Sequence, residues 1–256
     1  MSQPPERITS RDNPLLKELR KLSQDGSAYR KTGRCWVEGD HLARAALQRG
    51  VQPAVAVLAE SAWPALGGEF GAVARKTVLL PDALFDGISG LESPARLGLV
   101  LELPAETAVR AGQAAVLLDR VQDAGNVGSI LRSAAAFGFA QVIALKGTAA
   151  LWSPKVLRAG MGAHFGLHLV EGADVQALVG LGLPLLVTSS HQGELLHRAR
   201  LPWPCAWVLG HEGQGVGPEL MARAALSVRI AQPGGEESLN VAAAAAICLH
   251  ASAAAR

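Results

Sequence analysis

Three short polar segments, each following an apolar run, carry the side chains that could do chemistry. They are residues 123–128, which lead to Arg132, residues 210–215 and residues 237–240. The runs before them have the length and composition of buried strands. In a mainly parallel α/β sheet, ligands bind at the carboxyl ends of strands, so these segments are candidate binding loops.

The first segment contains two polar side chains of different character. Asn126 precedes the apolar positions Val127, Ile130 and Leu131, so it could cap a helix or act on a ligand. Capping does not account for Arg132, which would lie one to two turns into that helix among small residues. A guanidinium at this place could bind a phosphate or a ribose oxygen through two parallel hydrogen bonds.

The second segment combines three glycines with Glu212. Closely spaced glycines let the backbone approach a ligand, and a carboxylate can bind a hydroxyl or a cation. The Gly-x-Gly-x-x-Gly fingerprint of dinucleotide-binding domains is not met, since Pro218 follows Gly213 and Gly215. A plain tight turn is the alternative, and it leaves Glu212 without a role.

The third segment has the residues of a helix start. Ser238 or Asn240 could cap the alanine-rich helix expected from about residue 239, and Glu236 and Glu237 would favour its positive end. A capped helix start still presents backbone N–H donors to a ligand. Capping and ligand binding are therefore compatible here.

Strand-like and helical stretches alternate from residue 114 onward, as expected for a parallel sheet with helices on both faces. Strands are expected over residues 114–119, 141–145, 166–170, 185–188, 206–209 and 228–231, and helices over residues 127–137, 175–181 and 218–224. Residues 36–103 predict a second, smaller α/β unit, with a helix over 42–49 and strands over 55–59, 77–80 and 97–103. The polar stretch between them predicts domains over 1–104 and 113–256 joined by a linker, 105–112.

Composition places the chain among globular proteins. Hydrophobic residues make up 49% and charged residues 18%, and the core must be aliphatic because aromatics are only 4%. No apolar run approaches the ~20 residues of a membrane-spanning helix, and the N-terminus lacks an apolar leader, so we expect a cytoplasmic protein. Cys35, Cys205 and Cys248 are expected as buried free thiols. No metal site is expected, because His164 and His168 lack a metal-binding pattern.

Positive charge is concentrated near the N-terminus. Residues 1–34 hold eight Lys or Arg and four Asp or Glu, a surplus of four in a chain of net charge +2. This suits a polyanionic partner such as RNA, or else a solvated helix whose apolar side is Leu15, Leu16, Leu19 and Leu22. The residues expected to contact RNA here are Lys17, Arg20, Lys21, Arg30 and Lys31.

The order of the segments resembles the SpoU/TrmH branch of the SPOUT RNA methyltransferases. Residues 126–132 (Asn-Val-Gly-Ser-Ile-Leu-Arg), 208–215 and 238–242 resemble its three motifs. Residues 13–17 and 36–39 look like the ribosomal-protein-like substrate domain of many members. Departures include Ala124 where the family usually has Pro, and Ala231-Gln232 where it usually has Pro-Met.

The resemblance implies S-adenosylmethionine as cofactor, a ribose 2′-hydroxyl of rRNA or tRNA as acceptor, a trefoil knot in the C-terminal domain, and a homodimer with shared active sites. It implies catalytic roles for Asn126, Arg132, Glu212, Ser238 and Asn240. It implies cofactor contacts from Leu209, Gly210, His211, Glu212, Gly213, Ile230, Ser238, Leu239 and Asn240, with Arg132 also contacting RNA. Arg132 could serve as base or could position the acceptor and lower its pKa. A catalytically inactive RNA-binding assembly factor on the same fold is the alternative function.

Overall fold

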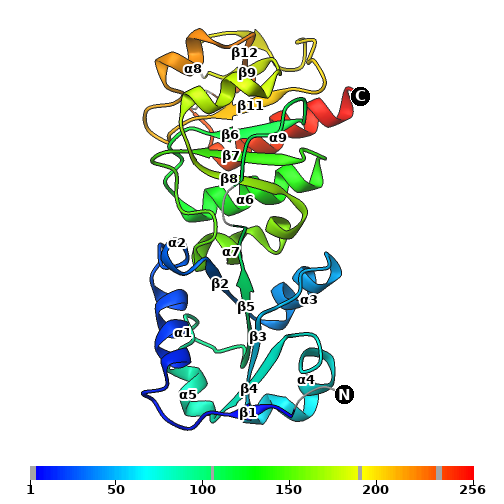
Figure 1. Ribbon diagram of the computed structural model, residues 1–256. Coiled ribbons are helices and arrows are strands. Elements are labelled where there is room, and N and C mark those ends of the chain that lie inside the picture. The colour runs from blue at the N-terminus through cyan, green and yellow to red at the C-terminus, as the bar shows by residue number, and fades with distance from the viewer. Residues whose placement is uncertain (1–3, 105–106, 190–191, 235–237) are drawn as a thin grey trace. The chain divides into compact units, whose positions relative to one another are not determined.

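The chain folds as two compact units, each built around its own sheet (Figure 1). The computed structural model describes residues 4–104, 107–189, 192–234 and 238–256. Unit 1 comprises Met1–Ala105 and Trp152–Phe165, and unit 2 comprises Glu106–Leu151 and Gly166–Arg256. The segment Trp152–Phe165 therefore groups with unit 1, although it lies in the range expected for the second domain.

Unit 1 contains a mixed five-stranded sheet in the order β1-β4-β3-β5-β2. Its strands are β1 (Glu6–Arg7), β2 (Arg34–Glu38), β3 (Val55–Ala59), β4 (Lys76–Leu80) and β5 (Leu97–Glu102). β3 and β4 are parallel, whereas β5 runs antiparallel to both β2 and β3. The predicted strands over 55–59, 77–80 and 97–103 are confirmed. β2 was not predicted as a strand.

Several helices of unit 1 begin where the sequence supplies a cap or a proline. In α1 (Pro14–Gln24), Asn13 Oδ1 accepts a hydrogen bond from Leu15 N at 2.9 Å, and such a cap contributes about 1 kcal/mol. Leu16, Leu19 and Leu22 are buried, so the predicted amphipathic helix is confirmed. The other helices are α2 (Tyr29–Thr32), α3 (Asp40–Gln48), η1 (Glu60–Ala62), α4 (Trp63–Phe70), α5 (Asp82–Asp86), α7 (Pro154–Gly160) and η2 (Ala163–Gly166).

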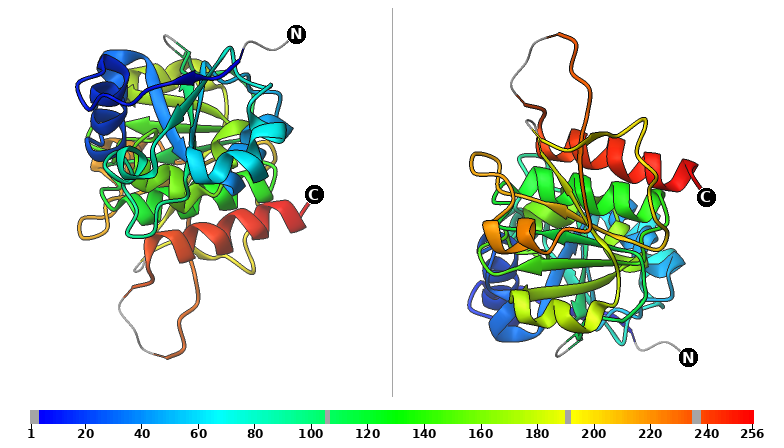
Figure 2. Two further views of the ribbon diagram at one scale, coloured as in Figure 1. Left: turned by 90° about the horizontal axis from the view of Figure 1, so that it is seen from below. Right: turned by 90° about the horizontal axis from the view of Figure 1, so that it is seen from above.

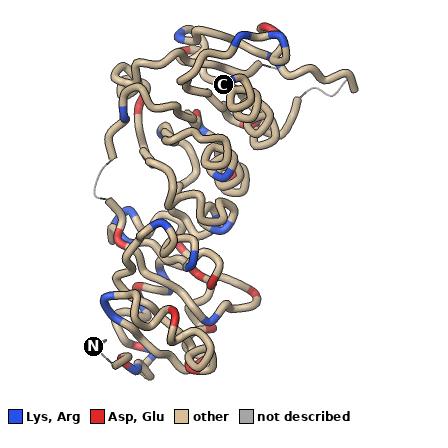
Figure 3. The backbone as a smooth tube through the Cα atoms, turned by 90° about the vertical axis from the view of Figure 1, so that its right-hand side faces the viewer, with Lys and Arg blue, Asp and Glu red and all other residues tan. Residues whose placement is uncertain are grey.

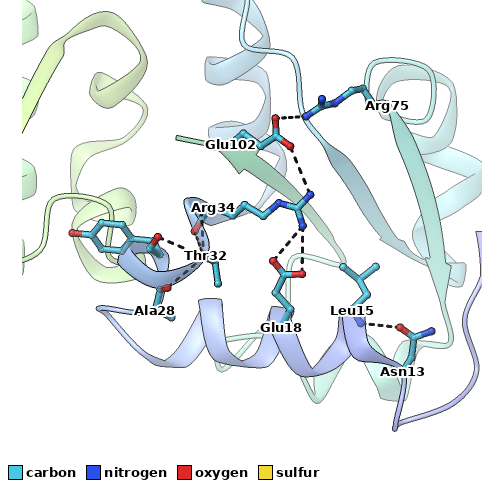
Figure 4. Close-up of polar contacts among 9 residues, drawn as sticks. Asn13, Leu15, Glu18, Ala28, Thr32, Arg34, Arg75 and Glu102 are labelled. Atoms are coloured by element: carbon cyan, nitrogen blue, oxygen red, sulfur yellow. Dashed lines mark hydrogen bonds and ion pairs between the residues drawn. The ribbon is translucent and has the colours of Figure 1, made fainter. Parts of the chain in front are cut away.

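An ion-pair cluster ties α1 to the sheet of unit 1 (Figure 4). Arg34 Nη1 lies 3.2 Å from Glu18 Oε1 on α1, and Arg34 Nη2 lies 3.8 Å from Glu102 Oε1 on β5. Arg75 also pairs with Glu102. Arg34 is therefore engaged by two carboxylates, and its charge is partly neutralised within the unit.

Unit 2 contains an all-parallel sheet of seven strands in the order β10-β12-β9-β11-β6-β7-β8. The strands are β6 (Ala115–Leu118), β7 (Gln141–Leu145), β8 (His168–Ala173), β9 (Leu185–Thr188), β10 (Glu194–Leu195), β11 (Ala206–Leu209) and β12 (Leu226–Arg229). In register, Leu118 lies opposite Leu209, and Thr188 opposite Val228. The carboxyl ends of β12, β9, β11 and β6 therefore meet at one edge of the sheet.

Helices cover both faces of this sheet, as predicted. The helices are α6 (Ala124–Ala136), η3 (Val175–Leu181), α8 (Pro218–Ala222) and α9 (Val241–Ala254). Val208 packs in a cluster with residues of η3 and α8, whereas its neighbour Trp207 donates from Nε1 to Ser252 Oγ on α9 at 2.9 Å. Because consecutive strand residues point to opposite faces, these contacts assign the two helical layers. α9 runs beside α6 (Figure 2).

Several expected elements differ in detail: β8 spans His168–Ala173 and not 166–170, and α6 begins at Ala124 and not at 127. β12 ends at Arg229, two residues before the predicted end, and residues 175–181 form a 3₁₀ helix. The three cysteines are buried and unpaired, as predicted, and burial raises the pKa of Cys35 and Cys248 to about 12 and that of Cys205 to about 11. Within the described ranges, no helix is long and apolar enough to cross a membrane.

Candidate active site

The first predicted loop enters α6 through a cap supplied by Asp123. Asp123 Oδ1 accepts a hydrogen bond from Asn126 N at 2.7 Å, and the helix begins at Ala124. The interpretation of Asn126 as the helix cap is therefore wrong. Since a carboxylate three residues earlier satisfies the helix start, the side chain of Asn126 is available to other partners.

Glu212 joins the second loop to the first. Its Oε2 accepts from Gln122 N at 3.2 Å, and its Oε1 accepts from Asp123 N at 3.1 Å and from Asn126 Nδ2 at 3.2 Å. These three donors come from residues about ninety positions earlier in the chain. Glu212 thus holds the two loops together at the carboxyl edge of the sheet.

Asn240 connects the third loop to the same network. Its Oδ1 caps α9 by accepting from Ala242 N at 2.9 Å and Ala243 N at 3.2 Å, which confirms the predicted cap. Its Nδ2 donates to Asn126 Oδ1 at 2.9 Å. Asn240, Asn126 and Glu212 therefore form one directed chain of hydrogen bonds across the three loops. Glu236 and Glu237, predicted to favour this helix start, lie outside the described residues.

The glycines of the second loop allow a compact backbone turn. His211 and Gly215 exchange two backbone hydrogen bonds, N to O at 3.0 and 2.8 Å, and Gly215 has a φ of +68°. A Cβ on Gly210 would lie 2.2 Å from Gly215 C, so only glycine fits there. His211 Nδ1 accepts from Gly213 N at 3.0 Å and Gln214 N at 3.2 Å. The imidazole is thus part of the loop's framework.

A cavity of about 670 Å³ opens beside the second and third loops. It is lined by the predicted Gly210, His211, Glu212, Gly213, Ile230, Ser238, Leu239 and Asn240. Residues outside the predicted cofactor contacts also line it: Thr188, Ser189, Gln214, Gly215, Val216, Met221, Gln232, Val241 and Ala244. Thr188 ends the strand predicted over 185–188 and Ser189 follows it, so both lie where parallel sheets bind ligands. Leu209 is buried at the end of β11 and is not among the lining residues.

The composition of the cavity fits S-adenosylmethionine. Its volume is that of a small-molecule site. Ile230, Leu239 and Met221 offer apolar contacts for a purine, and the glycine-rich backbone allows close approach. Gln232 Oε1 is buried without a hydrogen-bond partner among the described residues, so an acceptor is available to a ligand's N–H group. These residues would hold the cofactor, whose sulfonium supplies an activated methyl group.

Arg132 lies apart from this network. It is exposed on α6 and does not line the cavity. It follows Asn126 by six residues, which places the two side chains about 120° apart around the helix axis. The described hydrogen bonds of Glu212 do not include Arg132. Within one chain, Arg132 is therefore not brought together with the other predicted catalytic residues.

The hydrogen bonds to Glu212 keep its carboxylate ionised. Partial burial alone would raise its pKa, but the N–H groups of Asp123 and Gln122 and the amide of Asn126 outweigh burial, and the pKa lies below its usual 4.5. Glu212 is thus an anion at neutral pH that accepts hydrogen bonds.

Comparison with known proteins identifies the family. The model of the SpoU rRNA methylase family matches residues 113–250, more than half of the chain. The chain belongs to the SpoU rRNA methylase family. The predicted enzyme class is thereby confirmed: an RNA 2′-O-ribose methyltransferase that uses S-adenosylmethionine.

Family relatives match over nearly the whole chain. The 23S rRNA (guanosine(2553)-2′-O)-methyltransferase RlmP of Bacillus subtilis is 30% identical over 247 residues, covering 95% of this chain and 97% of RlmP. The AdoMet-bound rRNA methyltransferase structure from Sinorhizobium meliloti is 25% identical, with a TM-score of 0.83 over 96% of this chain and 97% of that one. An RNA 2′-O ribose methyltransferase structure is 28% identical, with a TM-score of 0.79 over 97% and 98%. The likeness therefore includes both units.

Proposed function

We propose that this member of the SpoU family methylates a ribose 2′-hydroxyl of ribosomal RNA in the cytoplasm. The observation that carries the proposal is the hydrogen-bond chain from Asn240 through Asn126 to Glu212, beside a cavity suited to S-adenosylmethionine. The choice of ribosomal RNA rests on the likeness to RlmP, a 23S rRNA methyltransferase.

The chain's own residues mainly position the reactants. Alignment of an acceptor with an activated methyl group can supply roughly 7–11 kcal/mol of the barrier. Asn126 and Glu212 hold the loops that receive the acceptor nucleotide, and Ser238 and Asn240 close the site beside the cofactor. A guanidinium stays charged at neutral pH and is a poor proton acceptor. We therefore assign Arg132 the task of binding the acceptor's phosphate and stabilising the negative charge that develops on the 2′-oxygen.

A homodimer would bring Arg132 to the network it does not reach within one chain. α9 is rich in alanine and apolar around its circumference, as expected for a helix buried on more than one side. Ile247 on α9 is nevertheless 41% exposed, and Leu239 just before it is 39% exposed. These features support a two-fold interface along α9 and its neighbour α6, with Arg132 acting in the partner's site.

Mixed dimers test this composite site. We expect Arg132→Ala and Glu212→Ala to be almost inactive separately. Co-expressed with different tags and purified through both, they should regain about half of the wild-type activity, because one of the two sites in each dimer is then intact. The measurement is methyl transfer from labelled S-adenosylmethionine to RNA. Activity no higher than that of the separate variants would place both residues in one chain's site and contradict the proposal.

Unit 1 is proposed to bind RNA. Lys17, Lys21, Arg30 and Lys31 are exposed on α1 and α2, and Arg20 donates to Arg11 O at 3.4 Å. Basic and acidic residues are interspersed along both units (Figure 3), so these helices provide a local rather than a general positive surface. The same proposal includes the division of the chain into a ribosomal-protein-like domain over residues 1–104, a linker over 105–112 and a methyltransferase domain over 113–256.

The trefoil knot is also part of the proposal. Support comes from the strand order: after β9 and β10, the chain returns to insert β11 between β9 and β6 at the centre of the sheet. The loops after β11 and β12 then bond to the loop after β6.

Mass spectrometry of nucleosides tests the function as a whole. Ribosomal RNA from a strain lacking this protein should lack one 2′-O-methyl mark, which the wild-type gene restores and the Arg132→Ala gene does not. An unchanged set of marks, together with no binding of S-adenosylmethionine in calorimetry, would favour the inactive assembly factor.

A further inference from the structure

Arg120 has a backbone conformation that side-chain-bearing residues rarely adopt, and it lies at the cofactor loop. Its φ is +59°, in the left-handed region. Such conformations persist only where neighbouring contacts over-determine them, and they concentrate at functional sites. Arg120 comes two residues after the end of β6, at the edge where the binding loops meet.

Arg120 and Asp119 form a two-pronged ion pair. Arg120 Nε lies 2.9 Å from Asp119 Oδ1, and Arg120 Nη2 lies 3.2 Å from Asp119 Oδ2. Consecutive residues of a strand point to opposite faces, so neighbours can pair in this way only where the backbone leaves the strand. The positive φ of Arg120 provides that departure. The side chain of Asp119 is only 8% exposed, which strengthens the pair.

The pair holds the second loop at Gln214 and the chain just after that loop at Gly217. Arg120 Nη1 donates to Gln214 Oε1 at 3.0 Å, and Asp119 Oδ2 accepts from Gly217 N at 2.7 Å. The arginine stem is held in turn against Gly147, where an added Cβ would lie 3.1 Å from Arg120 Cγ. Gln214 lines the cavity. The guanidinium therefore links the end of β6 directly to a wall of the cofactor site.

We propose that Arg120 is a positioning residue that, together with Asp119, sets the conformation of residues 211–217 and thereby the affinity for S-adenosylmethionine. Glu212 anchors the same loop to Gln122, Asp123 and Asn126. The loop is thus held from both sides by the segment after β6. The inference rests on the proposed function only where it concerns the role of the site in methyl transfer. The anchoring of residues 211–217 by Arg120 and Asp119 does not depend on the proposed function.

The test compares Arg120→Gly, Arg120→Lys and Gln214→Ala with the wild type. Arg120→Gly relieves the backbone strain but removes the contacts, so we expect affinity for S-adenosylmethionine in calorimetry to fall about tenfold. Gln214→Ala, at an exposed position that leaves folding intact, should reproduce part of this loss. Arg120→Lys should recover little of the lost affinity, since an ammonium group cannot reproduce the hydrogen bonds that the guanidinium makes to Asp119 and Gln214. KM for the cofactor should rise while kcat at saturation changes less than KM.

Two further measurements separate positioning from general destabilisation. In the cofactor-free protein, hydrogen exchange of residues 211–217 should accelerate in Arg120→Gly while that of β7 is unchanged. In the double variant Arg120→Gly/Gln214→Ala, affinity for S-adenosylmethionine should be less than twofold below that of Arg120→Gly alone. Both changes break the same hydrogen bond between Arg120 and Gln214.

The outcomes distinguish this inference from the proposed function. Wild-type affinity and wild-type exchange in Arg120→Gly would overturn the inference and leave the function intact. If Arg120→Gly does not fold, unchanged affinity in Gln214→Ala overturns it instead. Failure of the wild type to bind S-adenosylmethionine would contradict the function, and exchange in the cofactor-free protein would still decide the role of Arg120.

Discussion

Replacement of Arg132 by alanine is expected to lower methyl transfer roughly 10²–10³-fold, the usual effect of removing one donor that stabilises developing negative charge. The side chain is exposed on α6 and makes no hydrogen bond or ion pair within the described part of the chain. Its loss should therefore leave folding and affinity for S-adenosylmethionine unchanged. Single-turnover kinetics at saturating cofactor, together with calorimetry, measure the two quantities.

Arg110→Ala is the matched control, since Arg110 is also exposed. Its hydrogen bonds to the side chain of Gln141 use only its backbone N and O, which alanine retains. It should retain wild-type turnover. Full activity of Arg132→Ala would contradict both the base and the positioning roles. A single-turnover pH–rate profile of the wild type separates these roles: with Arg132 as base the rate rises with pH over the whole accessible range, whereas with an Arg132 that lowers the pKa of the 2′-hydroxyl the rate levels off at that lowered pKa.

Replacement of Glu212 by alanine is expected to lower methyl transfer about 100-fold or more, because small displacements of a positioning group have effects of that size. The change removes the acceptor of Gln122 N, Asp123 N and Asn126 Nδ2 at once. Unlike Arg132→Ala, it should also weaken the binding of S-adenosylmethionine, since Glu212 lines the cavity. Calorimetry and single-turnover kinetics distinguish the two variants.

Glu212→Gln is the conservative control, which keeps the shape and one acceptor oxygen but removes the charge. Because the folded-state pKa of Glu212 lies below 4.5, its ionised form contributes stability at neutral pH that is lost as the pH falls through that lower value. The difference in unfolding free energy between wild type and Glu212→Gln should therefore be constant from pH 6 to 8 and shrink below 4.5. A difference that grows on acidification would contradict this assignment.

Buried strands were predictable because their signal is local. The runs at 55–59, 141–145, 185–188 and 206–209 coincide with β3, β7, β9 and β11. The glycine-rich composition of residues 210–215 likewise predicts the loop after β11, whereas residues 124–128 belong to α6. β2 and the Trp152–Phe165 segment escaped prediction, because their placement depends on partners far away in the chain.

The roles of single polar residues were predicted less well. Asn126 has the chemistry of a cap, but Asp123 three residues earlier fills that position. The sequence does not indicate a role for Arg120, since a positive φ at a non-glycine residue cannot be predicted from the neighbouring residues. Its partner Gln214 is 94 positions away.

The sequence by itself determined the α/β class, the order of the three loops and the residue types they contain, because strand runs, helix starts and glycine turns depend on neighbouring residues. Only the tertiary structure decided which side chains meet. Asn240 reaches Asn126 across 114 positions because parallel register aligns the ends of β12, β9, β11 and β6. Arg132 stays outside that network because it points away from Asn126 around α6. A hydrogen bond forms only when its donor and acceptor are placed to within tenths of an ångström, and the packed sheet provides that precision.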